Sequence, residues 1–412
     1  MTATTPVRPR RRLRTLAAAT AVASAVAVGG ALPAAADEAA ASAESVARRW
    51  TPAKLPPGAA SLTGVTKPDA ATTWVAGFRL VEEGGGLDFR PTVYAKNGAG
   101  PWTEIPTATG ESGRINAIAS TSKKDVWVVG DQKASELGEP IMTQHWNGRS
   151  WTVVDVPTPP DSMGGGLLSV SAVGPDNVWA AGWAQIQDSA TPDPDGGPTH
   201  IESHHEGLIA HWDGRSWRRI PVPQPYAAWG LNSISASGPN NVWAVGNGYG
   251  DDNQPVALHY DGSKWSVLPT PPHGGVYGEF NSVVAKSPTD VWAVGRVLLD
   301  DKDRGHALVM HWNGKSWTRV AVPETAGPMY GAAPAPGGIV AAGKTYDRAN
   351  GYALRVVGNR ATSLGLPTDL PDGRSYAPWS VGTDPRTGTA TIVGVTENPQ
   401  GYPDPMVLTG RI

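Results

Sequence analysis

The chain has 412 residues, a formal net charge of −3 and no cysteine. The missing thiol excludes disulfide bonds, thiolate chemistry and cysteine metal ligands. Glycine (50) and proline (38) are abundant, and 17 tryptophans stand against 3 phenylalanines. This composition predicts an all-β fold with short strands, many turns and one aromatic residue used repeatedly.

The first residues predict an export signal. Residues 1–14 hold five arginines and no acidic residue, an apolar run covers residues 16–32, and Ala34-Ala35-Ala36 precedes Asp37. A basic start, an apolar middle and an A-x-A exit are typical of a secretory signal peptide, here cut after Ala36. The alternative is a membrane anchor, because the apolar run nearly reaches spanning length. The cleavage site favours export, which leaves no membrane span in the mature chain.

Export also changes the charge of the protein. Without the five leader arginines, 29 basic residues remain against 37 acidic ones, a net charge of −8. Nucleic-acid binding depends on Lys and Arg that neutralise phosphates, so we expect no nucleic-acid partner. The sequence predicts a secreted, monomeric protein with a signal peptide (1–36), a flexible segment (37–46) and one domain (47–412).

A motif centred on tryptophan recurs along this domain. Its seven copies are TTWVAG (72–77), DVWVVG (125–130), NVWAAG (177–182), NVWAVG (241–246), DVWAVG (290–295), GIVAAG (338–343) and ATIVG (390–394). Successive copies are 53, 52, 64, 49, 48 and 51 residues apart. The long step contains an insertion between Trp183 and Glu206. A fixed period of this length indicates a repeat architecture.

Each copy resolves into four short strands, because polar and apolar residues alternate with the period of a half-buried strand. In the fourth copy these strands cover residues 231–236, 241–246, 255–260 and 264–269. A second motif joins the last two strands and reads HWNGRSW (145–151), HWDGRSW (211–217), HYDGSKW (259–265) and HWNGKSW (311–317). Its Asn-Gly or Asp-Gly pair predicts a type I′ turn, which needs positive φ at both central residues. Its aromatic residues are expected to pack across the strands, and its histidine to belong to the scaffold.

Seven units of four strands predict a seven-bladed β-propeller. The ends of the domain support this prediction. Residues 405–412 match a third strand that lacks a fourth, and residues 47–56 match a fourth strand that lacks a third. We expect the two segments to pair and to close the ring, which removes sheet edges that would otherwise aggregate.

The repeat resembles known propeller families over essentially the whole mature chain. The stretch Tyr260-Asp261-Gly262-Ser263-Lys264-Trp265, which follows Val245-Gly246, resembles kelch repeats and the propeller of galactose-oxidase-like proteins. Asp213-Gly214-Arg215-Ser216-Trp217 is similar to the Asp-box hairpin of sialidase propellers, and the whole pattern resembles secreted propellers of actinomycetes. The galactose oxidase resemblance would imply copper-radical chemistry, which needs a cysteine and is excluded. Phe78-Arg79-Leu80-Val81 lacks the Ile and Pro of the sialidase motif Phe-Arg-Ile-Pro.

These resemblances imply that ligands meet the loops between strands two and three and between successive blades. The loops between blades carry aromatic and charged residues that could stack on and orient a carbohydrate or a peptide. They are Arg114, Tyr226, Trp229, His273, Tyr277, Glu279, Tyr330, Arg374, Tyr376 and Trp379. The alternative is that several of these rings plug the channel or pack between blades.

The insertion is the richest loop in potential metal ligands. His200, His204 and Glu206 are the expected ligands if it holds a zinc-type ion. Acidic residues at 193–195, 251–253 and 300–303 could share a calcium ion. The alternative is that both groups keep exposed loops soluble, in which case no cofactor is needed.

Motifs of catalysis are missing from the sequence. It has no G-x-S-x-G elbow, no H-E-x-x-H and no P-loop. The sequence therefore favours a secreted binding module for a carbohydrate, peptide or protein partner. The alternative is an extracellular polysaccharide hydrolase or lyase that uses loop carboxylates or a His/Glu metal site.

Overall fold

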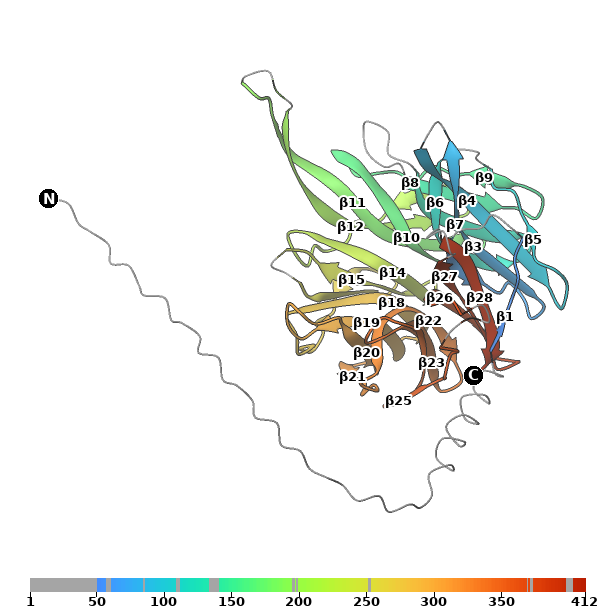
Figure 1. The fold of residues 1–412 in the computed structure, drawn as a ribbon. Helices are drawn as coiled ribbons and strands as arrows, with labels where there is room; N and C mark the ends of the chain where they lie inside the picture. The colour runs from blue at the N-terminus through green and yellow to red at the C-terminus, as the bar shows by residue number, and fades with distance from the viewer. Residues whose placement is uncertain are drawn as a thin grey trace, which may run out of the picture. The chain divides into compact units, whose positions relative to one another are not determined.

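The computed structural model describes residues 50–56, 61–83, 86–108, 112–132, 141–194, 197, 199–250, 253–368, 370, 373–397 and 403–412. In these ranges the chain forms 28 strands and no helix, and the strands make seven four-stranded antiparallel sheets (Figure 1). The predicted seven-bladed β-propeller is confirmed. The predicted signal peptide and the segment 37–46 lie outside the described residues. Among the described residues there is no helix of a length and hydropathy that could cross a membrane.

All seven blades share one strand order. The inner strands are β2 (Ser61–Thr66), β6 (Gly113–Ser122), β10 (Ser162–Gly174), β14 (Trp229–Gly238), β18 (Tyr277–Ser287), β22 (Ala326–Ala335) and β26 (Tyr376–Asp384). The second strands are β3 (Thr72–Glu83), β7 (Asp125–Gln132), β11 (Asn177–Thr191), β15 (Asn241–Gly248), β19 (Asp290–Leu298), β23 (Gly338–Thr345) and β27 (Thr389–Glu397). The third strands are β4 (Gly86–Asn97), β8 (Ile141–Trp146), β12 (His200–Trp212), β16 (Pro255–Tyr260), β20 (His306–Trp312), β24 (Gly351–Val357) and β28 (Pro403–Arg411). The outer strands are β5 (Thr103–Glu104), β9 (Trp151–Val153), β13 (Trp217–Arg219), β17 (Trp265–Val267), β21 (Trp317–Arg319), β25 (Arg360–Ser363) and β1 (Trp50–Pro52). We number the blades 1 to 7 in the order of their inner strands.

The ring closes as predicted, by pairing the two ends of the domain. Blade 7 has the order β1-β28-β27-β26, and Trp50 pairs with Gly410 while Pro52 pairs with Leu408. Its inner strand β26 contacts β2 of blade 1. The indole of Trp50 is buried among residues of blades 6 and 7. Ring closure therefore has a hydrophobic contribution as well as ladder hydrogen bonds.

Every inner strand is bulged at the same point, and this bulge explains the recurring glycine. The register shifts by one residue at Thr63, Asn116, Leu168, Asn232, Asn281, Tyr330 and Trp379. The glycine that ends each VWAVG-type motif lies opposite. A Cβ built on any of these seven glycines would lie only 1.9–2.0 Å from a carbonyl oxygen of the inner strand. Only glycine allows this close approach of two backbones.

The recurring tryptophans lock neighbouring blades together. Trp127 of blade 2 lies 4.9 Å from Trp212 and 5.2 Å from Trp217 of blade 3. The same clamp holds Trp74 between Trp146 and Trp151, Trp179 between Tyr260 and Trp265, and Trp243 between Trp312 and Trp317. The predicted packing across the hairpin is confirmed, with ring centroids 5.6–6.0 Å apart. The second motif thus recurs because each hairpin holds the tryptophan of the preceding blade.

The histidine of the second motif belongs to this scaffold. His259 stacks on Trp243 with centroids 4.3 Å apart, and its Nε2 lies 2.8 Å from Asn241 Oδ1. Trp243 Nε1 donates to the same oxygen at 3.1 Å. In the other copies the histidine Nε2 is hydrogen-bonded to Oδ1 of Asp125, Asn177 or Asp290, at 2.6–3.1 Å. In blades 3, 4 and 5 one Asx oxygen therefore positions both rings.

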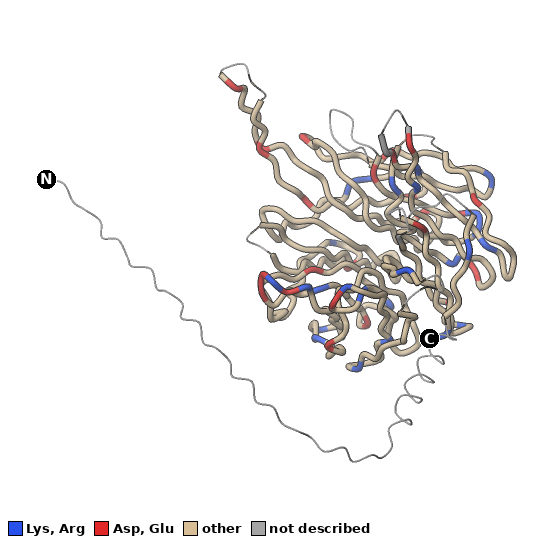
Figure 2. The backbone as a smooth tube through the Cα atoms, viewed as in Figure 1, with Lys and Arg blue, Asp and Glu red and all other residues tan. Residues whose placement is uncertain are grey.

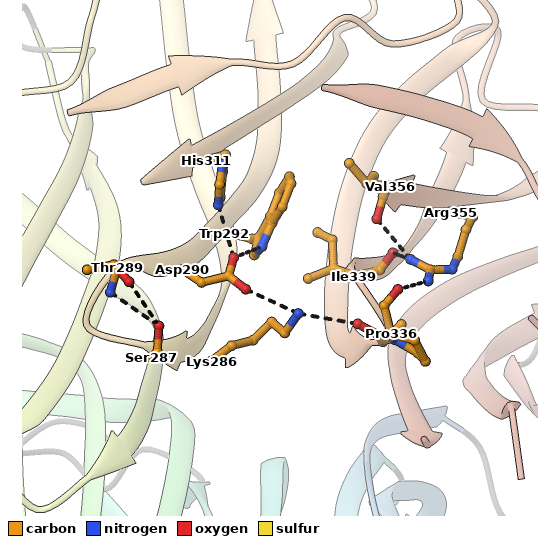
Figure 3. A network of polar contacts seen from close by, with 11 residues as sticks. Lys286, Ser287, Thr289, Asp290, Trp292, His311, Pro336, Ile339, Arg355 and Val356 are labelled. Atoms are coloured by element: carbon orange, nitrogen blue, oxygen red, sulfur yellow. Dashed lines mark hydrogen bonds and ion pairs between the residues drawn. The ribbon is translucent and has the colours of Figure 1, made fainter. Parts of the chain in front are cut away.

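In blade 5 this Asx residue is Asp290, and it belongs to a polar network that connects blade 5 with blade 6 (Figure 3). Asp290 Oδ1 accepts hydrogen bonds from Trp292 and His311, and Asp290 Oδ2 lies 3.2 Å from Lys286 Nζ. Lys286 also donates to the carbonyl of Ala335 in blade 6. Burial alone would raise the pKa of Asp290, but hydrogen bonds from His311 and Lys286 outweigh burial and lower the pKa.

The substitution Asp290→Asn tests this network, because blades 3 and 4 carry Asn177 and Asn241 at the same position. We expect a loss of less than about 1 kcal/mol at neutral pH, since the carboxyl is partly exposed. The folded pKa of Asp290 is lowered, so its contribution is complete above the unfolded value of about 3.9 and vanishes as pH falls through the folded value. Urea unfolding should show the two proteins converging as pH falls from about 5 to about 2. A gap that widens on acidification contradicts the assignment.

The hairpin tip differs from the predicted turn. Trp146 pairs with Trp151, so the connection contains the four residues 147–150. Gly148 has a φ of 93°, whereas Asn147 is not among the described residues with positive φ. Instead, Asn147 Oδ1 accepts hydrogen bonds from the N–H groups of Arg149 and Ser150. The prediction of a type I′ turn was wrong, because the Asx side chain stabilises a wider turn of its own.

The insertion in blade 3 was predicted as a loop, and most of it is a long hairpin. Strands β11 and β12 pair from Val178 and Trp212 out to Thr191 and His200. Strand β10 accompanies β11 only as far as Ile186. Beyond that point the two strands form a ribbon that extends well past the other strands of the blade (Figure 1).

Candidate functional site

The inner strands surround a channel at the centre of the ring. The cavity measures about 580 Å³ and is lined by all seven inner strands, a size in the range of small-molecule sites. One end of it, which we call the mouth, is formed by the starts of the inner strands and the ends of the second strands. The connections between blades and the loops between second and third strands lie at this same end, because the strands are antiparallel.

The seven bulge residues line this channel. They are Thr63, Asn116, Leu168, Asn232, Asn281, Tyr330 and Trp379. Bulges redirect a side chain out of the alternation of a strand. All seven line the channel, so the bulge that requires the recurring glycine also shapes the channel wall.

The polar bulge residues link one blade to the next. Asn116 Nδ2 donates to the carbonyl of Leu167, Asn232 Nδ2 to that of Phe280 and Asn281 Nδ2 to that of Met329, at 2.9–3.1 Å. Deeper in the channel, serine hydroxyls of one inner strand accept hydrogen bonds from backbone N–H groups of the next. The pairs are Ser169 with Ile234, Ser171 with Ala236, Ser233 with Val283, Ser235 with Ala285 and Ser282 with Ala332. These backbone groups are therefore already paired inside the ring.

The residue after each motif glycine differs in every blade. These post-glycine residues are Phe78, Asp131, Trp183, Asn247, Arg296, Lys344 and Val395. In six of the seven blades this residue still pairs with the inner strand, on the mouth side of the bulge, and Lys344 is the exception. The scaffold before the glycine repeats from blade to blade, whereas the mouth after it does not.

Four of the predicted ligand residues lie at the mouth on blades 5 to 7 and form two contacting groups. Glu279 Oε1 lies 2.8 Å from Arg296 Nε, and the hydroxyl of Tyr277 donates to Glu279 Oε2. The guanidinium of Arg296 lies over the ring of Tyr277, 5.2 Å from its centroid. Tyr330 of blade 6 packs against Trp379 of blade 7, with centroids 4.8 Å apart at 49°. We call Tyr277, Glu279, Arg296, Tyr330 and Trp379 the mouth cluster.

Charge and burial set the protonation of this cluster. Burial raises the pKa of Tyr277 and the charge of Glu279 raises it further, so the phenol stays protonated and donates. Burial would lower the pKa of Arg296, but Glu279 and Tyr277 outweigh it and raise the pKa. Burial raises the pKa of Tyr330, which Arg348 and Arg296 partly offset. Tyr330 is thus within electrostatic range of the ion pair, and the pair itself is neutral.

Arg114, another predicted ligand residue, lies at the equivalent place on blade 2. It pairs with Asp131 across the strands, where blade 5 pairs Glu279 with Arg296, so the two charges are exchanged. Both Arg114 Nε and Nη2 lie 2.8 Å from Asp131 Oδ2, and Asn116 Nδ2 donates to Asp131 Oδ1. The guanidinium also covers the ring of Phe89. Arg114 is therefore at the mouth but outside the mouth cluster.

Three other predicted rim residues are buried instead of exposed. Trp229, His273 and Tyr376 are 1%, 3% and 2% exposed. Their rings pack over Gly207, Gly278 and Gly351, where the missing side chain makes room. Trp229 and Tyr376 begin an inner strand and wedge against the third strand of the preceding blade, so the alternative of packing between blades holds for them.

Two remaining predicted residues also lie outside the mouth cluster. Tyr226 is half-buried and packs against the core cluster that joins blades 3 and 4. Arg374 Nη1 lies 2.7 Å from Asp404 Oδ2 within blade 7. Of the ten residues predicted as ligand contacts, Tyr277, Glu279, Tyr330 and Trp379 belong to the mouth cluster.

The predicted metal ligands lie on the hairpin of blade 3, where His204 and Glu206 are in contact but His200 is not near them. The Nδ1 of His204 lies 2.8 Å from Asp188, and its Nε2 lies 3.2 Å from Glu206. His200 is four residues further along β12, about 13 Å away at the usual rise of a strand. Within the described ranges, no group of three or more His, Asp or Glu is placed to hold a metal ion. Figure 2 shows acidic residues and no Lys or Arg along this hairpin.

The acidic loops have local roles where they are described. Asp300 Oδ1 accepts the N–H of Lys302, and Asp303 accepts the N–H groups of Leu299 and Gly305. Asp195, Asp251 and Asp252 lie outside the described residues. In the part that is described, the carboxylates of the 300–303 loop bind their own backbone.

Sequence reasoning missed Arg296 and five of the seven bulge residues, all except Tyr330 and Trp379. A signal for Arg296 was present, since it directly follows the motif glycine and ends the repeated pattern. The bulges carried no such signal, because their side chains range from Thr to Trp and only strand pairing reveals the register shift.

Comparisons with known proteins support the fold. No known protein family matches the chain, and no curated protein matches it. A structure of YCF48 bound to a D1 peptide superposes with a TM-score of 0.53 and 13% identity, covering 88% of this chain and 95% of the other. YCF48 from Cyanidioschyzon merolae superposes with a TM-score of 0.54 and 14% identity, covering 88% of this chain and 98% of the other. Kuenenia stuttgartiensis hydrazine synthase superposes with a TM-score of 0.50 and 12% identity, covering 82% of this chain and 94% of the other. At these identities the similarity shows the propeller fold alone.

Proposed function

We propose that this protein is a secreted binding module that holds a carbohydrate or a polypeptide segment at the mouth of the propeller. The observation that carries the proposal is the contrast between scaffold and mouth. The motif glycine, the tryptophan clamp and the bulge recur around the ring, whereas seven different residues follow the glycine. A rigid scaffold that presents a varied set of side chains beside a cavity is the organisation of a binding site.

The similar structures are compatible with this function. One of them contains YCF48 with a bound D1 peptide, so a protein of this fold binds a peptide. Another is hydrazine synthase, so the fold by itself does not separate binding from catalysis. The argument for binding therefore depends on the residues at the mouth.

Those residues do not favour the hydrolase or lyase alternative. Glycoside hydrolysis needs two carboxyl groups about 5–10 Å apart. We consider the described residues that follow a motif glycine and the inner-strand residues that pair with them. Among these, the carboxylates are Asp131 and Glu279. Each is paired with an arginine, and they lie three blades apart in a ring of seven. Neither is placed to act with the other on one bond.

A binding screen with two arginine variants tests the proposal. The full chain is applied to a glycan array and to a peptide array, and each hit is repeated with Arg296→Ala and Arg215→Ala. Arg215 is an exposed residue of a hairpin tip at the end of the ring away from the mouth. We expect Arg296→Ala to weaken binding at least about tenfold, since truncation of a central contact costs 2 kcal/mol or more. Arg215→Ala should bind like the native chain. Empty arrays, or equal losses in both variants, contradict the proposal.

A further inference from the structure

We infer that the mouth cluster binds a neutral pyranose unit of a glycan, with the ring of the sugar on the indole of Trp379. This inference rests on the proposed function, and it names the ligand class of that site. Three features of the described residues carry it: an exposed aromatic platform, an ion pair of zero net charge on the blade next to Tyr330, and backbone groups of several inner strands that are already hydrogen-bonded.

The platform is the pair Trp379 and Tyr330. Trp379 is 38% exposed and is the one tryptophan among the exposed large hydrophobic residues of the described part of the chain. Tyr330 packs against it, and both line the cavity. An exposed indole beside a cavity offers a flat apolar face with a polar edge. The C–H face of a pyranose ring fits such a surface.

The ion pair supplies directional polar contacts without net charge. Glu279 presents acceptors and Arg296 presents donors in a fixed arrangement, because Tyr277 holds the carboxylate and also lies under the guanidinium. A sugar hydroxyl both donates and accepts, so it can bond to both members of the pair at once. A charged ligand would gain little from a pair that sums to zero.

The inner strands argue against the main alternative, which is a peptide that adds as a strand. Strand addition needs a row of unpaired backbone N–H and C=O groups. On β14, β18 and β22 the N–H groups of Ile234, Val283 and Ala332 are bonded to serine hydroxyls of the preceding blade. Carbonyls of Leu167, Phe280 and Met329 are bonded to asparagines. Side chains are then left to recognise the ligand, as the cluster does.

The test compares Trp379→Ala with Val357→Ala on neutral, amino and acidic glycans and on a peptide array. Val357 is an exposed apolar residue beside the turn of blade 6, at the end of the ring away from the mouth. We expect neutral glycans to bind the native chain and Val357→Ala equally, and to bind Trp379→Ala at least about tenfold more weakly. Trp379→Phe, which keeps part of the platform, should fall between them. It also replaces Trp379→Ala if that variant does not fold.

The remaining outcomes separate this inference from the proposed function. Binding of peptides alone, or of acidic or amino glycans in preference to neutral ones, overturns the inference and leaves the binding module standing. Neutral glycan binding that Trp379→Ala leaves unchanged overturns the assignment to this cluster. No ligand on any array contradicts the proposed function itself.

Discussion

Replacement of Trp243 by alanine is expected to destabilise the protein by about 3–5 kcal/mol, as for other buried large aromatic residues. Trp243 is fully buried and lies 5.4 Å from Trp312 and 5.5 Å from Trp317 of the next blade. Its loss leaves a cavity between blades 4 and 5 and also removes the ring on which His259 stacks. Guanidinium unfolding followed by circular dichroism measures the change.

Trp379→Ala is the matched control for this experiment, because it removes the same side chain from an exposed position. We expect a change of about 1 kcal/mol or less. A similar destabilisation in both variants, or a native midpoint for Trp243→Ala, would show that the tryptophan clamp does not hold the blades together.

The second large effect is expected for Gly246→Ala. A Cβ on Gly246 would lie 2.0 Å from the carbonyl oxygen of Gly230, 2.8 Å from the Cα of Leu231 and 2.9 Å from the carbonyl carbon of Gly230. All three atoms are backbone, so no rotamer change relieves the overlap. The inner and second strands of blade 4 must separate at the bulge, at a cost of about 3 kcal/mol or more.

Gly238→Ala provides the comparison within the same blade. Gly238 ends β14, and a Cβ placed on it would meet no atom within 4 Å. This variant should unfold at the native midpoint or slightly above it, since alanine restricts the unfolded chain. If Gly246→Ala were tolerated as well as Gly238→Ala, close approach at the bulge would not be the reason for the recurring glycine.

The sequence predicted the architecture because each repeat contains the alternation of polar and apolar residues that specifies its strands. Alternating residues gave the four strands, and the segment around Trp50 with residues 405–412 gave the closure that pairs Trp50 with Gly410. The turn chemistry was less well predicted. An Asn-Gly pair is compatible with both a two-residue turn and the wider Asx turn, and the side chain of Asn147 decides between them only once its partners are known.

The site was predicted less completely than the fold. Trp229, Tyr330, Tyr376 and Trp379 were predicted in connections between blades, but all four lie in inner strands; the first and third are buried, and the other two line the channel. The difference comes from three residues of offset along the inner strand and from a glycine in the preceding blade, Gly207 or Gly351, that makes room for the ring. Neither feature belongs to the recurring motifs. The sequence pattern therefore could not distinguish an aromatic residue buried between blades from one that lines the channel.

Hydrogen–deuterium exchange of the full chain, with and without the array ligand that binds most tightly, tests the binding role of the mouth most directly. We predict slower exchange in peptides that contain Tyr277–Asn281 and Tyr376–Ser380, with unchanged exchange at the hairpin tips 147–150, 213–216, 261–264 and 313–316. Protection at those tips, or none at the starts of the inner strands of blades 5 to 7, would contradict the account.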